Sequence, residues 1–185
     1  SPVISVGSVT VGGTGKTPLV IEVVQRLAAL GRRPAILTRG YRRRSIEPSI
    51  VIGAGQPVPV SVTGDEAQIY VHSGYAHAGI GADRWSTGRL LEERYKPDLF
   101  LLDDGFQHRR LARDLDIVML DALNPFAGGA VVPLGKLREP PSALARAGAP
   151  RGRRPLERRC PRHRRRDAHA RHRRCLPPRP CLCRR

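Results

Sequence analysis

The stretch TVGGTGKT, residues 10–17, has the composition of a loop that binds phosphate groups. Glycines let successive backbone N–H groups turn toward phosphate oxygens, and a helix that starts directly after the loop adds its positive dipole end. Lys16 can reach the terminal phosphates of a nucleotide, and the Thr17 hydroxyl can bind Mg²⁺. The common pattern is G-x-x-x-x-G-K-[ST]; here Thr10 replaces the first glycine, and two later glycines supply the flexibility. The predicted nucleotide-binding residues are Thr10, Val11, Gly12, Gly13, Thr14, Gly15, Lys16 and Thr17.

DLFLLDD, residues 98–104, is the natural partner of such a loop. An apolar strand that ends in aspartate places a carboxylate beside the Mg²⁺ of a bound nucleotide. Either Asp103 or Asp104 can take this position, and because adjacent carboxylates repel each other, a bound Mg²⁺ would relieve the pair. Such a strand is a weak signal alone and a strong one beside a phosphate loop. Together the two motifs predict nucleotide binding, but they do not identify the acceptor.

Three further stretches combine charged and polar residues where loops meet strands or helices. They are LTRGYRRRS at 37–45, GDEAQ at 64–68 and DDGFQHRRLARD at 103–114. Each of them taken alone fits a solvated loop, and a lone histidine such as His108 is more often structural than catalytic. Their meaning therefore depends on the elements that position them.

Apolar runs alternate with amphipathic runs through the first 150 residues. Strands are predicted at 3–9, 34–38, 49–53, 97–104 and 115–122, and helices at 17–30, 64–72 and 83–95. The first helix is expected to place Leu19, Val23, Leu27 and Leu30 on one face. This alternation predicts an α/β fold with a mainly parallel sheet flanked by helices. Ligands of such sheets bind at the carboxyl ends of the strands, which is where the motifs fall.

The motifs VGSVTVGGTGKTP, LTRGY, GDEAQ, LLDDGFQHRRLARDLDIVMLDA and PLGKLREPPSALARA, in this order, resemble those of tetraacyldisaccharide 4′-kinase, the lipid A kinase of Gram-negative bacteria. The resemblance covers residues 1 to about 148. It implies a P-loop NTPase-like fold, with ATP and Mg²⁺ as cofactors. It also implies transfer of the γ-phosphoryl group to the 4′-hydroxyl of a tetraacylated disaccharide 1-phosphate. This lipid A precursor and the cytoplasmic face of the bacterial inner membrane are the implied partners, with no nucleic acid or protein partner expected.

The resemblance also implies roles for individual residues. The implied catalytic group is Asp65, as the base, with Lys16 and Asp104. The implied metal ligands are Thr17, Asp103, Asp104 and Glu66, with the choice between the two aspartates left open. Candidates for the substrate side are Arg39, Arg42, Gln107, His108 and Arg138. Arginine suits a fixed phosphate because its donor fork is bidentate.

The last part of the chain, residues 149–185, has a different composition. The formal net charge is +17, yet residues 1–150 hold 18 Lys and Arg against 14 acids, whereas residues 151–185 hold 15 Arg, no Lys and two acids. That segment contains all four cysteines and no Val, Ile, Phe, Tyr, Trp or Met. We predict a kinase core at 1–148 and, at 149–185, a disordered tail read in a shifted frame. Its cysteines lack the spacing of a zinc site.

The family is expected to extend beyond this chain at both ends, so we expect this chain to be nearly inactive as a kinase. Two alternatives stay open: another P-loop switch or metallochaperone, and a basic nucleic-acid-binding protein that depends on the tail. Two features oppose the P-loop switch or metallochaperone. Val11 stands where many of those ATPases have a lysine, and residues 1–150 contain no N-K-x-D motif. No apolar run approaches 18 residues, so no membrane segment is expected in this chain.

Overall fold

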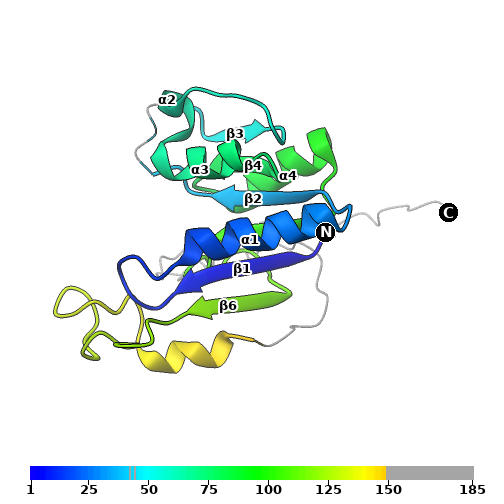
Figure 1. The fold of residues 1–185 in the computed structure, drawn as a ribbon. Coiled ribbons are helices and arrows are strands. Elements are labelled where there is room, and N and C mark those ends of the chain that lie inside the picture. The colour runs from blue at the N-terminus through cyan, green and yellow to red at the C-terminus, as the bar shows by residue number, and fades with distance from the viewer. Residues whose placement is uncertain (42, 44, 149–185) are drawn as a thin grey trace, which may run out of the picture.

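The computed structural model describes residues 1–41, 43 and 45–148 (Figure 1). The predicted tail at 149–185 and the substrate candidate Arg42 lie outside the described residues. The strands are β1 (Val3–Ser8), β2 (Pro34–Thr38), β3 (Ser49–Ile52), β4 (His77–Gly81), β5 (Leu99–Asp103) and β6 (Leu115–Met119). The helices are α1 (Lys16–Ala29), α2 (Val60–Thr63), α3 (Asp65–Ser73), α4 (Arg84–Tyr95) and the 3₁₀ helix η1 (Pro141–Arg146).

The strands form a single sheet in the order β3-β4-β2-β5-β1-β6. All neighbouring pairs are parallel except β3 with β4, so the predicted mainly parallel α/β sheet is confirmed. Val6 of β1 pairs with Asp103 of β5, which brings the end of β5 beside the strand that leads into the glycine-rich loop. The sequence motifs therefore meet at the carboxyl edge of the sheet, on the left in Figure 1.

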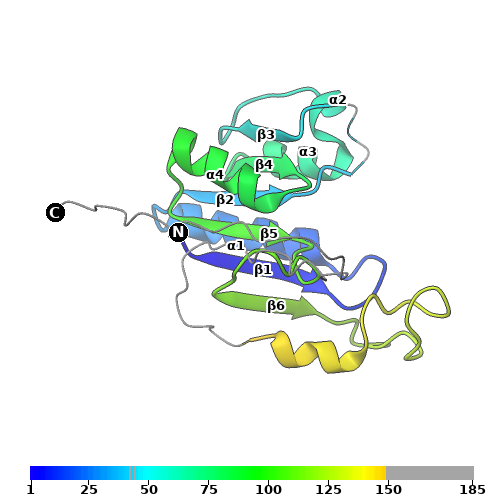
Figure 2. The ribbon, with the colours of Figure 1, turned by 180° about the vertical axis from the view of Figure 1, so that it is seen from behind.

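Helices cover both faces of the sheet. α1 and α3 lie on one face and α4 on the other, as the front and back views show (Figures 1 and 2). On β5, Leu101 packs in the cluster with Val20 of α1, whereas Phe100 packs with Leu91 of α4. Since both faces of β5 are buried, the strand reads in the sequence as a continuous apolar run rather than an alternating one.

Strand β4 was not predicted from the sequence. Its sequence, HAGIG, contains two glycines, and glycine is depleted in strands. Close packing against α4 explains both of them. A Cβ at Gly79 would lie 2.6 Å from Leu91 Cδ1, and a Cβ at Gly81 would lie 2.3 Å from Thr87 Oγ1. The glycines are thus required by the approach of the helix to the strand.

Helix α1 buries a slightly different face from the predicted one. Val20 and Val24 are its fully buried residues, and the predicted Leu19, Val23 and Leu27 are partly buried at the edge of the same cluster. The prediction is wrong for Leu30, which is 77% exposed because the helix ends at Ala29 and Leu30 is its C-cap.

The segment after β6 returns to the glycine-rich loop and then forms η1. Leu137 is buried in a small cluster with Val9, Phe106 and Ala143. The helix η1 thus lies next to β6, the edge strand of the sheet (Figure 1). In the described part of the chain, every helix is too short or too polar to cross a bilayer.

Candidate nucleotide-binding site

The glycine-rich loop connects the end of β1 to the start of α1. Gly12 has φ 123° and Gly15 has φ 74°, conformations that favour glycine, and no other atom lies within 4 Å of a Cβ built at Gly12. The loop is anchored on its far side, where the Val11 N–H donates to the Lys136 carbonyl at 2.8 Å. The first turn of α1 contains no acidic residue, so its positive dipole end is available to an anion.

Asp104 joins the loop to the segment that contains Arg138. Lys16 Nζ lies 3.5 Å from Asp104 Oδ1, and Arg138 Nη1 donates to Asp104 Oδ2 at 2.6 Å. Gln107 accepts from the same Arg138 nitrogen at 3.3 Å and donates to the Ser8 carbonyl at 2.9 Å. Asp104 itself has φ 50°, which turns the chain away from β5 directly after Asp103. Two cations therefore share the Asp104 carboxylate at the base of the loop.

Asp103 has a different environment although it is the preceding residue. Its side chain is buried and accepts a hydrogen bond from Thr38 Oγ1 at 3.2 Å. Among the described residues it forms no ion pair with a Lys, Arg or His. Burial raises the pKa of Asp103, the charges of Asp104 and Glu66 raise it further, and the nearby Tyr70 and Thr38 hydroxyls oppose the shift.

The residues around Asp103 fit a magnesium ion. Mg²⁺ prefers oxygen ligands and is usually held by one or two carboxylates together with nucleotide phosphates and waters. Asp103 offers a buried carboxylate without a cation, and the Thr17 hydroxyl follows Lys16 in the first turn of α1. Within the described residues, His, Cys, Asp and Glu side chains form no group of three that could hold a metal. Glu66, a predicted ligand, is thus not gathered with the two aspartates.

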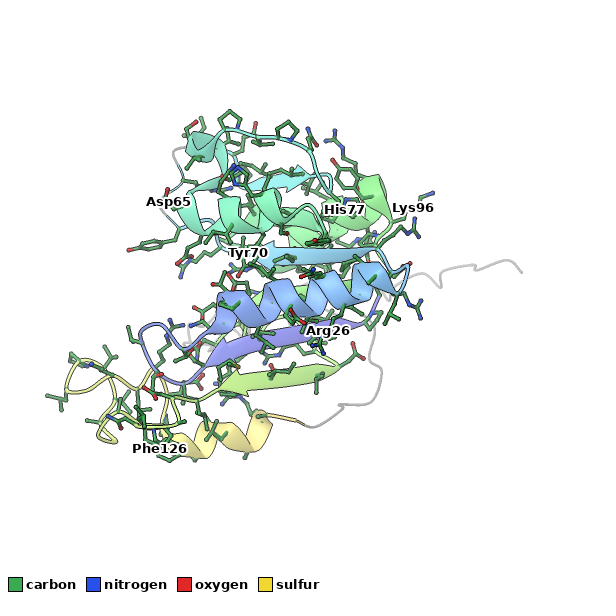
Figure 3. All side chains as sticks on the ribbon, viewed as in Figure 1. Arg26, Asp65, Tyr70, His77, Lys96 and Phe126 are labelled. Atoms are coloured by element: carbon green, nitrogen blue, oxygen red, sulfur yellow. The ribbon has the colours of Figure 1, made fainter. Side chains whose placement is uncertain are left out.

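Asp65 and Glu66 form the exposed start of α3 at the same edge of the sheet (Figure 3). Gly64 precedes them with φ 79°, and a Cβ there would lie 2.6 Å from the Tyr41 carbonyl oxygen, so this turn requires glycine. The Asp65 side chain makes no hydrogen bond or ion pair with another described residue. Its carboxylate is therefore accessible to solvent at the edge where the glycine-rich loop lies.

The candidates for the substrate side differ in accessibility. Arg39 is exposed directly after β2, whereas Gln107 and Arg138 belong to the Asp104 network. His108 is partly buried, and its Nε2 has no hydrogen-bond partner among the described residues. Burial, and then the nearby positive charge of Arg84, lower the pKa of His108 to about 4. The ring is thus neutral at pH 7 and has a nitrogen free to hydrogen-bond.

The model of the tetraacyldisaccharide-1-P 4′-kinase family matches residues 1–167. The chain belongs to this family. The predicted resemblance is confirmed, and the match continues past residue 148, where the resemblance was predicted to end. The chain is also similar to proteins named tetraacyldisaccharide 4′-kinase. It is 49% identical to that of Geobacter metallireducens over 152 residues, which cover 79% of this chain and 44% of the relative. It is 47% identical to that of Anaeromyxobacter dehalogenans over 150 residues, covering 80% and 40%.

A solved structure of an LpxK from Aquifex aeolicus, described as an "apo" form in complex with ATP, has the same fold. It aligns with a TM-score of 0.72 and 37% identity, covering 79% of this chain and 46% of the Aquifex chain. The chain spans less than half the length of the tetraacyldisaccharide 4′-kinases that it matches.

Two arginines near the site were missed in the sequence. Arg84, at the start of α4, is 6% exposed, and its Nη1 donates to the carbonyls of Gly81 and Ala82 at 2.9 and 3.2 Å. Because the strand that precedes it, β4, was not predicted, nothing in the sequence indicated that Arg84 would lie at the carboxyl edge. Arg113 pairs with the buried Asp116 at 3.2 Å and donates to the Gly105 carbonyl at 2.7 Å. It thereby fastens the turn that follows Asp103 and Asp104, and its place in the kinase motif DDGFQHRRLARD was the available signal.

Proposed function

We propose that the chain is the nucleotide-binding part of a tetraacyldisaccharide 4′-kinase. In this proposal the γ-phosphoryl group of ATP is transferred to the 4′-hydroxyl of tetraacyldisaccharide 1-phosphate. The observation that carries it is the network at the carboxyl edge, where Lys16 and Arg138 converge on Asp104 beside a glycine-rich loop. Phosphoryl transfer depends mainly on positioning and charge neutralisation, and this edge supplies both.

Each residue of the site has a part in the proposed reaction. The loop amides and the ammonium group of Lys16 bind the phosphates, and Lys16 is held at the loop by Asp104 and by Ser8 Oγ at 3.4 Å. Asp103 and Thr17 are the side chains that would hold Mg²⁺, which neutralises phosphate charge when it is bound. We infer that Asp103, rather than Asp104, is the metal-binding aspartate, because Asp104 already has two cations and Asp103 has none.

Asp65 is the proposed base. Asp65 is the exposed first residue of α3, and its carboxylate forms no hydrogen bond or ion pair with another described residue. The acceptor hydroxyl can therefore reach it. Asp65 would accept the proton of the 4′-hydroxyl as that oxygen attacks the γ-phosphorus, while the bond between the γ-phosphorus and the β–γ bridging oxygen breaks and ADP leaves. Arg39, exposed after β2, is the candidate for the acceptor's 1-phosphate, and the acceptor lipid would be met at the cytoplasmic surface of the inner membrane.

Two measurements on the 185-residue chain test this proposal. The first is calorimetric titration with ATP in the presence of Mg²⁺, for which we expect saturable binding that is weaker in the Lys16→Ala variant. The second is transfer of radiolabelled γ-phosphate to tetraacyldisaccharide 1-phosphate, which we expect to be weak because the chain spans less than half of its relatives. Absence of Mg·ATP binding by the parent chain would overturn the proposal. Transfer to the lipid that survives Asp65→Asn would overturn the role of Asp65.

A further inference from the structure

Tyr70 is a fully buried side chain that none of the site roles above uses. It lies on α3, one turn after Glu66, and is 1% exposed. Figure 3 places it between α3 and α1, beneath the helix that begins with Asp65. Its ring packs in the main core cluster, with Val6, Val20, Val24, Ile36 and Leu101 among its members.

The hydroxyl group of Tyr70 has no hydrogen-bond partner among the described residues. It lies near the Thr17 and Asp103 side chains, but no contact there has the geometry of a hydrogen bond. A buried donor without a partner destabilises the fold, and phenylalanine would fill the same space without that penalty. An orphaned hydroxyl in a packed core therefore requires an explanation from function.

The surroundings of this hydroxyl indicate which partner it would take. The phenol of a tyrosine is protonated at neutral pH, so the Tyr70 hydroxyl can act as a hydrogen-bond donor. Asp103 already accepts one hydrogen bond, from Thr38 on β2. A carboxylate has acceptor sites for more than one donor. The two hydroxyls thus approach Asp103 from two different elements, β2 and α3.

We propose that Tyr70 is a positioning residue for Asp103, whose carboxylate accepts the phenol O–H when Mg·ATP binds at the edge of the sheet. This inference rests on the proposed nucleotide site. The bond would connect α3 to the end of β5, so the helix that begins with Asp65 would be held in a fixed relation to the phosphates. Groups that orient a metal-binding carboxylate from behind typically affect metal affinity by 10–100-fold.

The test compares Tyr70→Phe with the parent chain and with Tyr75→Phe. Tyr75 is 42% exposed and its hydroxyl is 3.5 Å from Gln25 Nε2, so it is a matched control for loss of one phenol oxygen. A fluorescent ATP analogue reports binding, once with EDTA and once across a Mg²⁺ titration, and thermal unfolding is followed without ligand. For Tyr70→Phe we expect an unfolding midpoint equal to or above that of the parent. We also expect unchanged binding in EDTA and a Mg²⁺ half-saturation concentration about 10-fold higher.

The outcomes separate this inference from the proposed function. Tyr70→Phe with the same Mg²⁺ half-saturation as the parent overturns the inference and leaves the nucleotide site intact. A lower unfolding midpoint without ligand, with equal Mg²⁺ dependence, would assign Tyr70 a purely structural role and also overturn it. A parent chain that binds no ATP analogue at any Mg²⁺ concentration overturns the proposed function and this inference with it.

Discussion

The two aspartates at the end of β5 are neighbours in the sequence and have opposite electrostatic surroundings. On the Asp104 side, Lys16 and Arg138 bring two positive charges from α1 and from the segment before η1. On the Asp103 side, the carboxylate accepts a hydrogen bond from Thr38 of β2, the Tyr70 hydroxyl of α3 lies nearby, and burial raises the pKa of Asp103. Environments that separate two like groups in this way commonly mark different roles.

The difference teaches how one short motif can supply two functions. In the structure Asp104 balances two cations, Lys16 and Arg138, that would otherwise repel each other beneath the loop. In the proposed function Asp103 would act toward the ligand, because an external cation would balance its buried charge. The turn at Asp104, with φ 50°, points the two carboxylates into these different surroundings. Substitutions at each side can break this assignment.

The largest expected effect is on the Asp104 side, at Lys16. Replacement by alanine removes a charged donor to the phosphates, and such bonds contribute about 1.5–3 kcal/mol. We therefore expect ATP affinity to fall about 10–100-fold in calorimetric titration. Arg32→Ala is the control, since Arg32 is exposed between α1 and β2, at the opposite edge of the sheet, and should bind ATP as the parent does. Equal affinities for the two variants would contradict a phosphate role for Lys16.

The next effect concerns stability and should differ in sign between the two acids. Asp104→Asn leaves Lys16 and Arg138 without a counter-charge, and because the pair is partly solvated we expect a loss of about 1–2 kcal/mol rather than the larger cost of a fully buried pair. Asp103→Asn should instead raise the free energy of unfolding at pH 7. Its pKa is raised in the fold, so its ionised form is the destabilising one.

Urea unfolding at pH 7 in EDTA measures both free energies of unfolding. EDTA keeps divalent cations from compensating the Asp103 charge, which is the state that the comparison concerns. If the two asparagine variants shift the unfolding midpoint in the same direction, the two acids do not have opposite surroundings, and the assignment of Asp103 to the metal loses its basis.

Much of the fold was predictable from the sequence because local pattern and tertiary packing agree. β2 was predicted at its observed bounds, and α4 begins after Asp83, whose carboxylate caps the helix by accepting from the Trp85 and Ser86 amides. β4 was not predictable in this way, since its glycines are explained by α4, which follows later in the chain. The sequence therefore predicted a mainly parallel sheet but not strand β4, which lies between β3 and β2.

The sequence supplied candidate residues for the site but not their arrangement. The motifs contain Lys16, Asp103 and Asp104, and the structure brings Lys16 and Asp104 together. The sequence left open which aspartate is the metal ligand because the distinction depends on contacts between distant residues, such as Arg138 with Asp104. Tyr70 was not among the candidates, because an apolar position on a helix predicts only burial. Only the structure shows that its hydroxyl is buried without a hydrogen-bond partner.

A smaller effect is expected from His108, which lies close to the positive charges of this edge. Its pKa is about 4 in the fold and near 6.5 when unfolded, so the unfolded chain binds the proton first as the pH falls. The parent should therefore lose stability between about pH 6.5 and pH 4, by about 1 kcal/mol at pH 5 after allowance for partial exposure. Urea unfolding of the parent and of His108→Gln at pH 7 and pH 5 isolates this contribution. An identical pH dependence in both chains would contradict it.

The smallest effect is expected on the Asp103 side, at Thr38. Thr38→Val keeps the shape of the side chain and removes the hydroxyl that donates to Asp103 at 3.2 Å. One neutral donor contributes about 0.5–1.5 kcal/mol, so the Mg²⁺ half-saturation for binding of the ATP analogue should rise about 2–10-fold. Thr38→Ser retains the hydroxyl and should restore the parent value. If Thr38→Val lowers the affinity for the ATP analogue in EDTA as much as in Mg²⁺, the hydroxyl supports the loop rather than the Asp103 carboxylate. That result would contradict the assignment of Thr38 to the Asp103 side.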